Sequence, residues 1–485
     1  MLYHLIVLGC QMNISDSERV RSVVEQMGFT HTDKEEDAQL LGILSCSVRQ
    51  KPIDKVYSRI YKWNRLKSKK NVLTFVSGCV LPDDREKFLK LFDFVFPMSE
   101  LNDFPSMMKE YGVASALSLQ APSEAFVIEE YFEQKPVQKV FKPVKMASIN
   151  SKPILPTNKD IFQLWNVQPN YQSEFEAYVP IQNGCDKFCS YCAVPFTRGR
   201  EISRPSAEIL EEISQLMQGG YKSITLLGQN VNSYGLERND EISFAQLLEK
   251  IGGLGEKLNN PAWVYFTSPH PRDMSRDVVE AIAKYKTLAK QIHLPLQSGD
   301  DHVLVKMNRK HNVDRYRESI MHIKELVPQA TLFTDIIVGF TGETEEQFQN
   351  TMNSFDEFQY NMAYIAMYSP RPGAQSFRWE DDIPKDTKKD RLQRLTDKLE
   401  GISLQYNQAL IGKEMTILVR NTERKTGYLS GHNEGKIVTR IISKDEHLIG
   451  KFVTVKVTEA SGFSITGELI KVNEEKQAKL QKANL

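Results

Sequence analysis

The sequence predicts an α/β protein: an N-terminal doubly wound α/β domain, a central partial (β/α) barrel of six units, and a small antiparallel β-barrel at the C-terminus. Three observations predict this class. Apolar runs alternate with helical segments early in the chain, six strand–helix units follow in series, and the last part is rich in Val, Ile, Thr and Gly. A chain of 485 residues is too long for one ordinary domain.

Residues 1–111 contain three apolar runs, each of which ends in a cysteine. The runs end at Cys10, Cys46 and Cys79, and apolar runs of this length are typical of buried parallel strands joined by crossover helices. Ligands of a doubly wound sheet gather at the carboxyl ends of its strands. We therefore expect the three cysteines to lie close together in space.

The first helix of this domain has signals for both of its ends. Ser15 and Glu18 have the spacing of a capping box, and Gly28 is the expected end of the helix. Its predicted apolar stripe is Val20, Val23, Val24 and Met27.

Residues 112–174 interrupt the pattern with six scattered prolines, so we expect a linker or insertion there. Strand and helix signals alternate again over residues 175–409, which favours a parallel sheet rolled into a partial or complete barrel. The expected strands are 177–182, 223–228, 263–268, 291–296, 332–340 and 362–369. The expected helices include 207–217, 278–285, 314–326, 345–358 and 386–410.

Residues 410–471 contain five short strand candidates, which are typical of a small antiparallel barrel, and residues 472–485 are an expected tail. The segment has ten Lys and Arg against seven Asp and Glu, a surplus that a solvated surface explains as well as an RNA-binding one. Small β-barrels hold single-stranded RNA with basic and aromatic side chains. Candidates for such a surface are Arg420, Arg424, Lys425, Tyr428 and Arg440.

The overall charge is balanced, with 62 Lys and Arg against 62 Asp and Glu. This balance argues against a globally basic nucleic-acid coat, although it allows a locally basic face.

The sequence has no apolar run of the ~18 to 20 residues that a membrane span needs, and no basic region precedes its first apolar run. We therefore expect a soluble, cytoplasmic protein, in which six cysteines indicate metal or redox chemistry.

Three of the cysteines follow the first barrel strand as Cys185, Cys189 and Cys192. Three thiolates on one loop can hold three irons of an iron–sulfur cluster, and a cubane then keeps one iron open for an exogenous molecule. Structural zinc usually takes four ligands from paired C-x-x-C units, and the sequence has no second pair. Three unreactive buried thiols are a further alternative.

Cys10, Cys46 and Cys79 form a second set of three candidate ligands, and the sequence has no further cysteine. A single cysteine at a strand end is most often a small core residue. Three cysteines in corresponding positions, each at the end of an apolar run, favour a second cluster held by three thiolates. The simplest assignment of all six cysteines is therefore two 4Fe-4S clusters.

The cysteine motif at the head of a six-unit barrel resembles that of the radical S-adenosylmethionine (SAM) superfamily. The chain as a whole is similar to its methylthiotransferase family, MiaB branch, including a C-terminal module that resembles the TRAM domain. The similar segments are GCQMNISDSE (Gly9 to Glu18), SCSVR, the GC at Gly78 and Cys79, YCAVPFTRGREISR, LLGQNVNSYG, HLPLQSGDD and YSPRPGA. The chain departs from the family pattern at Ser45, at Thr341 and in its long linker, and none of these departures removes a cysteine.

The resemblance implies an enzyme that adds a methylthio group to carbon 2 of N(6)-isopentenyladenosine next to the tRNA anticodon. It implies that SAM binds the open iron of the Cys185, Cys189 and Cys192 cluster, and that the other cluster carries the sulfur. Expected partners are tRNA and a one-electron donor protein such as a flavodoxin, with no membrane and no DNA. Alternatives are a different modified adenosine such as threonylcarbamoyl-adenosine, a ribosomal-protein aspartate, or a non-catalytic iron–sulfur protein that binds RNA or carries sulfur.

Further site candidates follow the barrel strands. The resemblance suggests SAM contacts at Gly228 and Gln229, although a tight turn explains both equally well, and at Gln297, Ser298 and Gly339, where loop chemistry is the alternative. Basic and imidazole candidates are Arg198, Arg200, Arg204, His270 and His293. The arginines could meet phosphate or carboxylate groups or could form a solvated loop, and a lone histidine is more often structural than catalytic.

Overall fold

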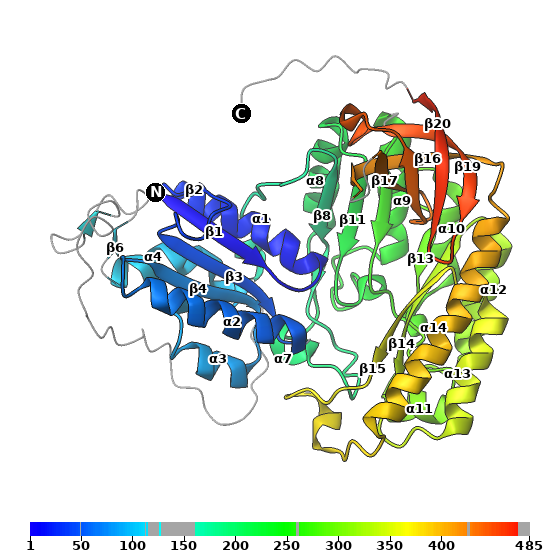
Figure 1. Ribbon diagram of the computed structural model, residues 1–485, viewed down its shortest axis with the longest axis horizontal. Helices are drawn as coiled ribbons and strands as arrows, with labels where there is room; N and C mark the ends of the chain where they lie inside the picture. Colours follow the sequence, from blue (N-terminus) through cyan, green and yellow to red (C-terminus); the bar gives the residue numbers. More distant parts are fainter. Residues whose placement is uncertain are drawn as a thin grey trace.

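The computed structural model describes residues 1–48, 50–111, 113–114, 126–127, 161–258, 261–423 and 427–473. Figure 1 shows an N-terminal α/β domain (blue and cyan) beside a central barrel (green to yellow), with a small β-barrel (orange and red) packed on one end of the central barrel. The predicted class and the order of its three parts are confirmed.

The N-terminal domain is a five-stranded parallel sheet in the order β2-β1-β3-β4-β5. The strands are β1 (Leu2–Val7), β2 (Thr30–His31), β3 (Leu40–Cys46), β4 (Leu73–Cys79) and β5 (Phe94–Val95). Neighbouring residues of a strand point to opposite faces. In β3, Leu40 and Leu44 share a core with α1 (Gln11–Gln26), whereas Leu41 and Ile43 share one with α2 (Gln50–Leu66). Both faces are thus covered, as a doubly wound sheet requires.

Three short helices complete this domain: α3 (Pro82–Phe88), η1 (Met98–Asp103) and α4 (Phe104–Glu110). A fourth, α6 (Ile161–Asn166), comes from the predicted linker and buries Ile161, Leu164 and Trp165 in the same core as α1. Two further strands of the linker, β6 (Val113–Ala114) and β7 (Phe126–Val127), pair in parallel. The rest of residues 112–160 lies outside the described part of the chain.

Helix α1 begins four residues before the predicted capping box, so that prediction is wrong. Gly9 turns the chain with a φ of +134°, Cys10 occupies the N-cap position, and Ser15 lies inside the helix. The Ser15 hydroxyl donates to the Tyr178 carbonyl oxygen of the central barrel, 3.1 Å away. The predicted end is right, because Gly28 follows the C-cap with a φ of +92°.

The central barrel consists of two three-stranded parallel sheets, β12-β11-β8 and β13-β14-β15, which an isolated parallel bridge between Val264 and Leu288 links. All six predicted strands are present: β8 (Glu176–Pro180), β11 (Ser223–Leu227), β12 (Trp263–Phe266), β13 (Gln291–His293), β14 (Thr331–Val338) and β15 (Met362–Met367). In the described residues no ladder joins β15 to β8, so the barrel is partial.

Helices follow the barrel strands and cover their outer face (Figure 1). They are α8 (Ser206–Gln218), α9 (Phe244–Leu258), α10 (Arg276–Lys284), α11 (Asp301–Lys306), α12 (Val313–Leu326), α13 (Glu345–Phe358) and α14 (Lys385–Gln408). Short 3-10 turns are η3 (Val231–Ser233), η4 (Pro271–Asp273) and η5 (Gln375–Arg378). Among the described helices, none is long and apolar enough to cross a membrane.

The C-terminal barrel closes in the order β16-β17-β18-β20-β19. Its elements are β16 (Glu414–Thr422), β17 (Tyr428–Asn433), β18 (Val438–Ile442), η6 (Glu446–Leu448), β19 (Phe452–Ala460) and β20 (Ser464–Val472). The predicted antiparallel pairing is wrong for one pair, because β18 and β20 are parallel. The hairpin of β19 and β20 places β20, and not β19, beside β18, and β20 runs in the direction of β18.

The C-terminal barrel packs on the amino ends of the central strands. Lys222, just before β11, donates to the Gly450 carbonyl oxygen at 2.9 Å, and Thr331, at the start of β14, donates to the Gly435 carbonyl oxygen at 2.7 Å. The rings of Trp263 and Phe452 meet with centroids 4.6 Å apart. The carboxyl ends of the strands, where ligands of such barrels bind, therefore remain available for a site.

Candidate active site

The three N-terminal cysteines lie at the carboxyl edge of the sheet. Cys46 and Cys79 are the last residues of β3 and β4 and are directly paired in register. Cys10 precedes α1, and a Cβ atom added to neighbouring Gly9 would lie 2.8 Å from the Cβ atom of Cys46. Glycine, with no side chain and a φ of +134°, allows this close approach of the chain next to Cys10 to the end of β3.

Polar side chains surround the sulfur of Cys79. Arg198, from the central barrel, places its Nε 2.9 Å from the Cys79 Sγ and donates to it. Asn13 of α1 donates to the carbonyl oxygens of Leu8 and Ser45 at 2.8 and 2.9 Å, which joins the ends of β1 and β3. A hydrogen bond with Cys46 and burial raise the pKa of Cys79, and Arg198 opposes this rise.

The second cysteine trio lies on a loop between two short strands, β9 (Gln182–Asn183) and β10 (Ile202–Ser203), which pair antiparallel. Gly184, with a φ of +83°, begins this loop, and a Cβ atom there would lie 2.0 Å from the Arg200 carbonyl oxygen. The Cys192 amide donates to the Cys189 carbonyl oxygen at 3.0 Å. The loop is therefore compact and its three thiols lie on one short stretch of chain.

One buried arginine also contacts this second trio. Arg309 donates from Nη1 to the Cys189 Sγ at 3.4 Å and from Nη2 to the Pro295 carbonyl oxygen at 3.0 Å. Burial raises the pKa of Cys192 to about 12 and also raises that of Cys185. A metal must displace these protons before the thiols can bind it, so occupation of the site releases protons.

The donor chemistry of both trios fits iron–sulfur clusters. Each trio presents three soft thiols, and each has a guanidinium group that donates to one sulfur, which stabilises thiolate charge. Within the described residues, no group of three or more His, Cys, Asp or Glu side chains is already arranged to hold a metal ion. The cysteines therefore fit iron–sulfur clusters in two respects: they are thiol ligands, and each trio is grouped where strands end.

Gly228 and Gln229 follow β11 and contact residues that precede the second trio. A Cβ atom on Gly228 would come within 2.8 Å of the Gln182 Oε1. The Gln229 side chain accepts a hydrogen bond from the Gly184 amide at 2.6 Å, next to Cys185. Gln229 thus ties the end of β11 to the start of the cysteine loop.

Gln297 and Ser298 follow β13 but differ in their surroundings. Gln297 has a φ of +74°, which is rare for a residue with a side chain, and its backbone is paired with the segment around Ile336 of β14. Ser298 is fully buried, and its hydroxyl lies 3.4 Å from the Thr351 hydroxyl of α13. The Ser298 hydroxyl also accepts from the Asp300 amide at 3.3 Å, so it lies between its own loop and a helix of the outer layer.

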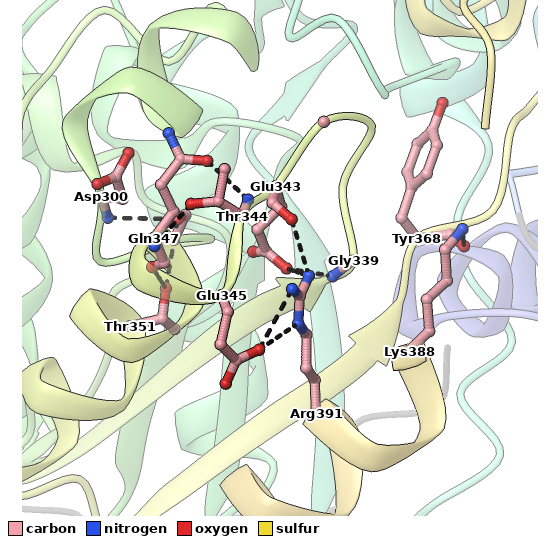
Figure 2. A network of polar contacts seen from close by, with 12 residues as sticks. Asp300, Gly339, Glu343, Thr344, Glu345, Gln347, Thr351, Tyr368, Lys388 and Arg391 are labelled. Carbon is pink, nitrogen blue, oxygen red and sulfur yellow. Dashed lines mark hydrogen bonds and ion pairs between the residues drawn. The ribbon is translucent and has the colours of Figure 1, made fainter. Parts of the chain in front are cut away.

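Gly339 follows β14 and lies in a buried polar network, which Figure 2 shows. Its amide donates to the Glu343 carboxylate at 2.6 Å, and the Arg391 guanidinium donates to the same carboxylate at 2.9 Å. A Cβ atom at Gly339 would lie 2.4 Å from the Lys388 Cγ, which requires glycine here. The next residue, Phe340, contacts the ring of Tyr191 in the cysteine loop, with centroids 6.4 Å apart.

The three arginine candidates divide according to burial. Arg198 is buried and pairs with the carboxylate of Asp16, and Arg204 is buried and pairs with Glu208 and Glu212, so both meet carboxylates. Arg200 has a 61% exposed side chain beside Asp186. All three arginines thus pair with carboxylates of the chain itself, and only Arg200 is largely exposed.

Each of the two histidine candidates has a hydrogen-bond partner within the chain. The ring of His270 caps η4 by accepting from the Arg272 amide at 3.2 Å, and burial lowers its pKa strongly. His293 lies 2.8 Å from the Asp335 carboxylate, on the neighbouring strand.

The candidate RNA-binding residues are only partly available on the C-terminal barrel. Arg420 forms an ion pair with Glu176 of the central barrel at 2.7 Å, and Arg440 lies 3.6 Å from Glu423. Arg440 keeps a 52% exposed side chain. Arg424 and Lys425 lie outside the described residues, and Tyr428 is partly buried at the start of β17.

Sequence reasoning did not single out Asn13, Asp16 or Arg309. Asn13 and Asp16 lie within the segment from Gly9 to Glu18, whose sequence resembles that of the family. That resemblance could have indicated that both residues belong to the site. Arg309 lies 120 residues from Cys189 in sequence, and no local spacing links the two.

Comparisons with known proteins agree with the three-part division. Residues 2–97 match the uncharacterized protein family UPF0004, residues 179–355 match the radical SAM superfamily, and residues 408–470 match the TRAM domain.

Relatives match almost the whole chain. A tRNA-2-methylthio-N(6)-dimethylallyladenosine synthase of Clostridium botulinum (strain Okra / Type B1) is 36% identical over 472 residues, covering 95% of each chain. A protein of the same name from Treponema denticola is 34% identical over 479 residues, covering 97% of this chain and all of its own.

Among solved structures, the radical SAM methyltransferase TsrM from Kitasatospora setae, with tryptophan substrate and a SAM analogue bound, matches 85% of this chain and 78% of its own. The TM-score is 0.50 and the sequence identity is 13%, which shows a shared fold.

Proposed function

The chain belongs to the family of tRNA-2-methylthio-N(6)-dimethylallyladenosine synthases, within the radical SAM superfamily, and we propose the specific reaction and site roles that follow. It is a radical SAM methylthiotransferase that acts on tRNA. The specific reaction is addition of a methylthio group to carbon 2 of N(6)-isopentenyladenosine beside the anticodon. The observation that carries this proposal is the near full-length similarity to synthases of that name, in a chain with a cysteine trio at strand ends in each α/β part.

The radical SAM family implies one 4Fe-4S cluster and SAM. The thiols of Cys185, Cys189 and Cys192 would hold this cluster, on the compact loop between β9 and β10. When bound, the cluster supplies the electron that cleaves SAM to a carbon radical, which can remove a carbon-bound hydrogen that no base could abstract.

The chain's own residues hold this loop in place. Gln229 accepts from Gly184, and Arg309 donates to Cys189, so the start and the middle of the motif are held. Tyr191 packs with Phe340 and Tyr368 behind the loop, and this apolar cluster excludes water from that side.

A second 4Fe-4S cluster on Cys10, Cys46 and Cys79 would carry the sulfur that is transferred. Its support is the shared edge of the sheet, the paired register of Cys46 and Cys79, and the Arg198 donor on Cys79. An electron donor protein such as a flavodoxin and a cytoplasmic location complete the proposal, as do domain limits of 1–111, 175–409 and 410–471.

The substrate is tested by mass spectrometry of tRNA nucleosides from a strain that lacks the gene. We expect isopentenyl-adenosine to accumulate at the expense of its methylthio form, and the wild-type gene to restore the methylthio form. A normal level of the methylthio form in the deletion strain, with loss of a modified threonylcarbamoyl-adenosine instead, would identify a different substrate.

The cluster assignment is tested on anaerobically reconstituted protein. We expect about eight irons per chain for two cubanes. C189A should lose SAM cleavage to 5′-deoxyadenosine, whereas C46A should keep SAM cleavage and lose methylthio transfer. About four irons in the wild-type protein would contradict the second cluster and leave the radical SAM assignment intact.

A further inference from the structure

A short helix physically links the two cysteine trios. Helix α7 (Val194–Arg198) begins two residues after Cys192 and ends at Arg198, whose Nε lies 2.9 Å from the Cys79 Sγ. Five residues of helix advance by only about 7 Å. In Figure 1, α7 lies below the N-terminal domain, near α2 and α3. Cys192 of the second trio is thus connected to Cys79 of the first through α7 and the hydrogen bond of Arg198.

The guanidinium of Arg198 is held from both domains. It donates to the Asp16 carboxylate at 2.5 Å and lies 3.4 Å from the Asn13 Oδ1, both on α1 of the N-terminal domain. It also lies 3.4 Å from the Asn183 Oδ1 on β9 of the barrel domain. The side chains of Arg198 and Asp16 are 5% and 4% exposed. The planar, multidentate donor set of arginine suits this geometry, whereas a lysine ammonium would make fewer directed bonds.

We propose that Arg198 is a positioning residue that couples the two cluster sites: it orients the Cys79 sulfur from the radical SAM domain and raises the reduction potential of the N-terminal cluster. This inference rests on the proposed second cluster. It assigns to the barrel domain a direct electrostatic influence on the cluster of the other domain.

The direction of the effect follows from charge. Hydrogen bonds to cluster sulfurs and the net charge nearby set the potential of an iron–sulfur cluster. A buried N–H donor and a positive charge stabilise the more negative, reduced state, so Arg198 raises the potential. Asp16 holds the guanidinium in place and partly neutralises it, so Asp16 alone acts in the opposite direction.

The test uses the full-length chain with C185A, C189A and C192A, reconstituted anaerobically so that only the N-terminal cluster is present, and redox titration followed by electron paramagnetic resonance. We expect R198Q to lower the ratio of reduced to oxidised cluster about tenfold at a fixed potential, a shift of 59 mV for one electron. R198K should shift less, because it keeps the charge. The matched control is R200Q, two residues away with a 61% exposed side chain, which should not shift.

D16N provides the second measurement and protects the test from a simple loss of folding. Removing the carboxylate leaves the arginine charge uncompensated, so we expect a shift to higher potential, opposite to that of R198Q. Opposite signs separate an electrostatic role from general loosening, which would move both variants the same way. Equal potentials for R198Q, R200Q and the unmodified background, or the same sign for R198Q and D16N, would overturn the inference. Failure of the second cluster itself would already show as about four irons in the wild-type protein, before any Arg198 variant is made.

Discussion

Single buried charges lie where domains and layers of this protein meet. Arg198 joins α7 to Asp16 of the N-terminal domain, and Arg391 joins α14 to Glu343 after β14, with side chains 4% and 1% exposed in the second pair. Removing one partner of such a pair leaves an unpaired charge in a low-dielectric site, which destabilises the fold. Each of these arginines therefore connects two elements through a buried ion pair whose loss is expected to be costly.

The pair in Figure 2 gives a prediction that depends on pH. Burial raises the pKa of Glu343 to about 7 although Arg391 opposes this rise, so ionised Glu343 is already disfavoured in the fold. R391M should lower the free energy of unfolding by about 3 kcal/mol at pH 8. At pH 6 the loss should be smaller, because Glu343 can take up a proton there. Urea unfolding at both pH values measures this.

The control for R391M is the double variant R391M/E343Q, which removes both charges. It should recover most of the lost stability at pH 8 and show little difference between pH 6 and pH 8. A pH-independent loss in R391M would contradict the role assigned to Glu343.

At the scale of elements, α1 explains why a helix in the N-terminal domain carries so many buried polar residues. Asp16, Glu18 and Arg19 are at most 3% exposed, because one side of α1 covers its own sheet and another side faces β8 of the barrel. An amphipathic stripe describes only the first of these contacts. The polar residues of α1 form the interface between the domains.

Asn13 is the residue of α1 on which the N-terminal cysteine site most depends. N13A leaves the carbonyl oxygens of Leu8 and Ser45 without their donor, which should cost about 1–3 kcal/mol of stability. The reconstituted variant should also lose up to half of its iron. Thermal melting and iron analysis measure the two effects, with Q26A, at the exposed end of α1, as the control. Wild-type iron content in N13A would contradict this role.

At the scale of the whole molecule, the two ends of the central barrel have separate roles. The cysteine loop, Gln229 and Gln297 follow the carboxyl ends of strands, whereas the C-terminal barrel is docked on the amino ends through Gly435 and Gly450. This division is typical of α/β barrels, in which the amino face contributes stability. The C-terminal barrel is thus a structural support of the central barrel, in addition to the tRNA contact proposed for it.

The pKa of Lys436, a residue at the contact between the two barrels, makes the stability of the fold depend on pH. Its ammonium lies 4.1 Å from the ring centroid of Tyr265, and burial, with a smaller contribution from Arg420, lowers its pKa to about 8. Between pH 8 and the unfolded pKa near 10.5, the unfolded chain binds more protons, so wild-type stability rises with pH. Relative to K436M, the wild-type protein should gain about 1–2 kcal/mol between pH 8 and pH 9.5.

Thermal unfolding of wild type and K436M across this pH range measures the effect. The matched control is K451M, an exposed lysine of the same small barrel, which should follow the wild-type curve. A constant difference between wild type and K436M from pH 7 to pH 9.5 would contradict a depressed pKa for Lys436.

Local patterns in the sequence predicted most of the helices and strands that the structure has, and they grouped the candidate cluster ligands. Period and apolar content identified all six central strands, and helix 345–358 was predicted with the bounds that the structure has. Motif spacing grouped Cys185, Cys189 and Cys192, because ligands on one loop are fixed by a few residues of backbone. The capping-box prediction failed, because positive φ at Gly9 starts α1 earlier and places Ser15 against the barrel.

The sequence by itself thus determined the three-part α/β architecture, the two cysteine trios and the family. Only the tertiary structure decided which side chains serve those trios: that Arg198 reaches Cys79 across 119 residues of sequence, that Ser298 packs on a helix, and that Arg420 pairs with the central barrel. The physical reason is that spacing along a chain governs contacts within an element or loop. Contacts between distant elements depend on how whole domains pack, and no local pattern encodes them.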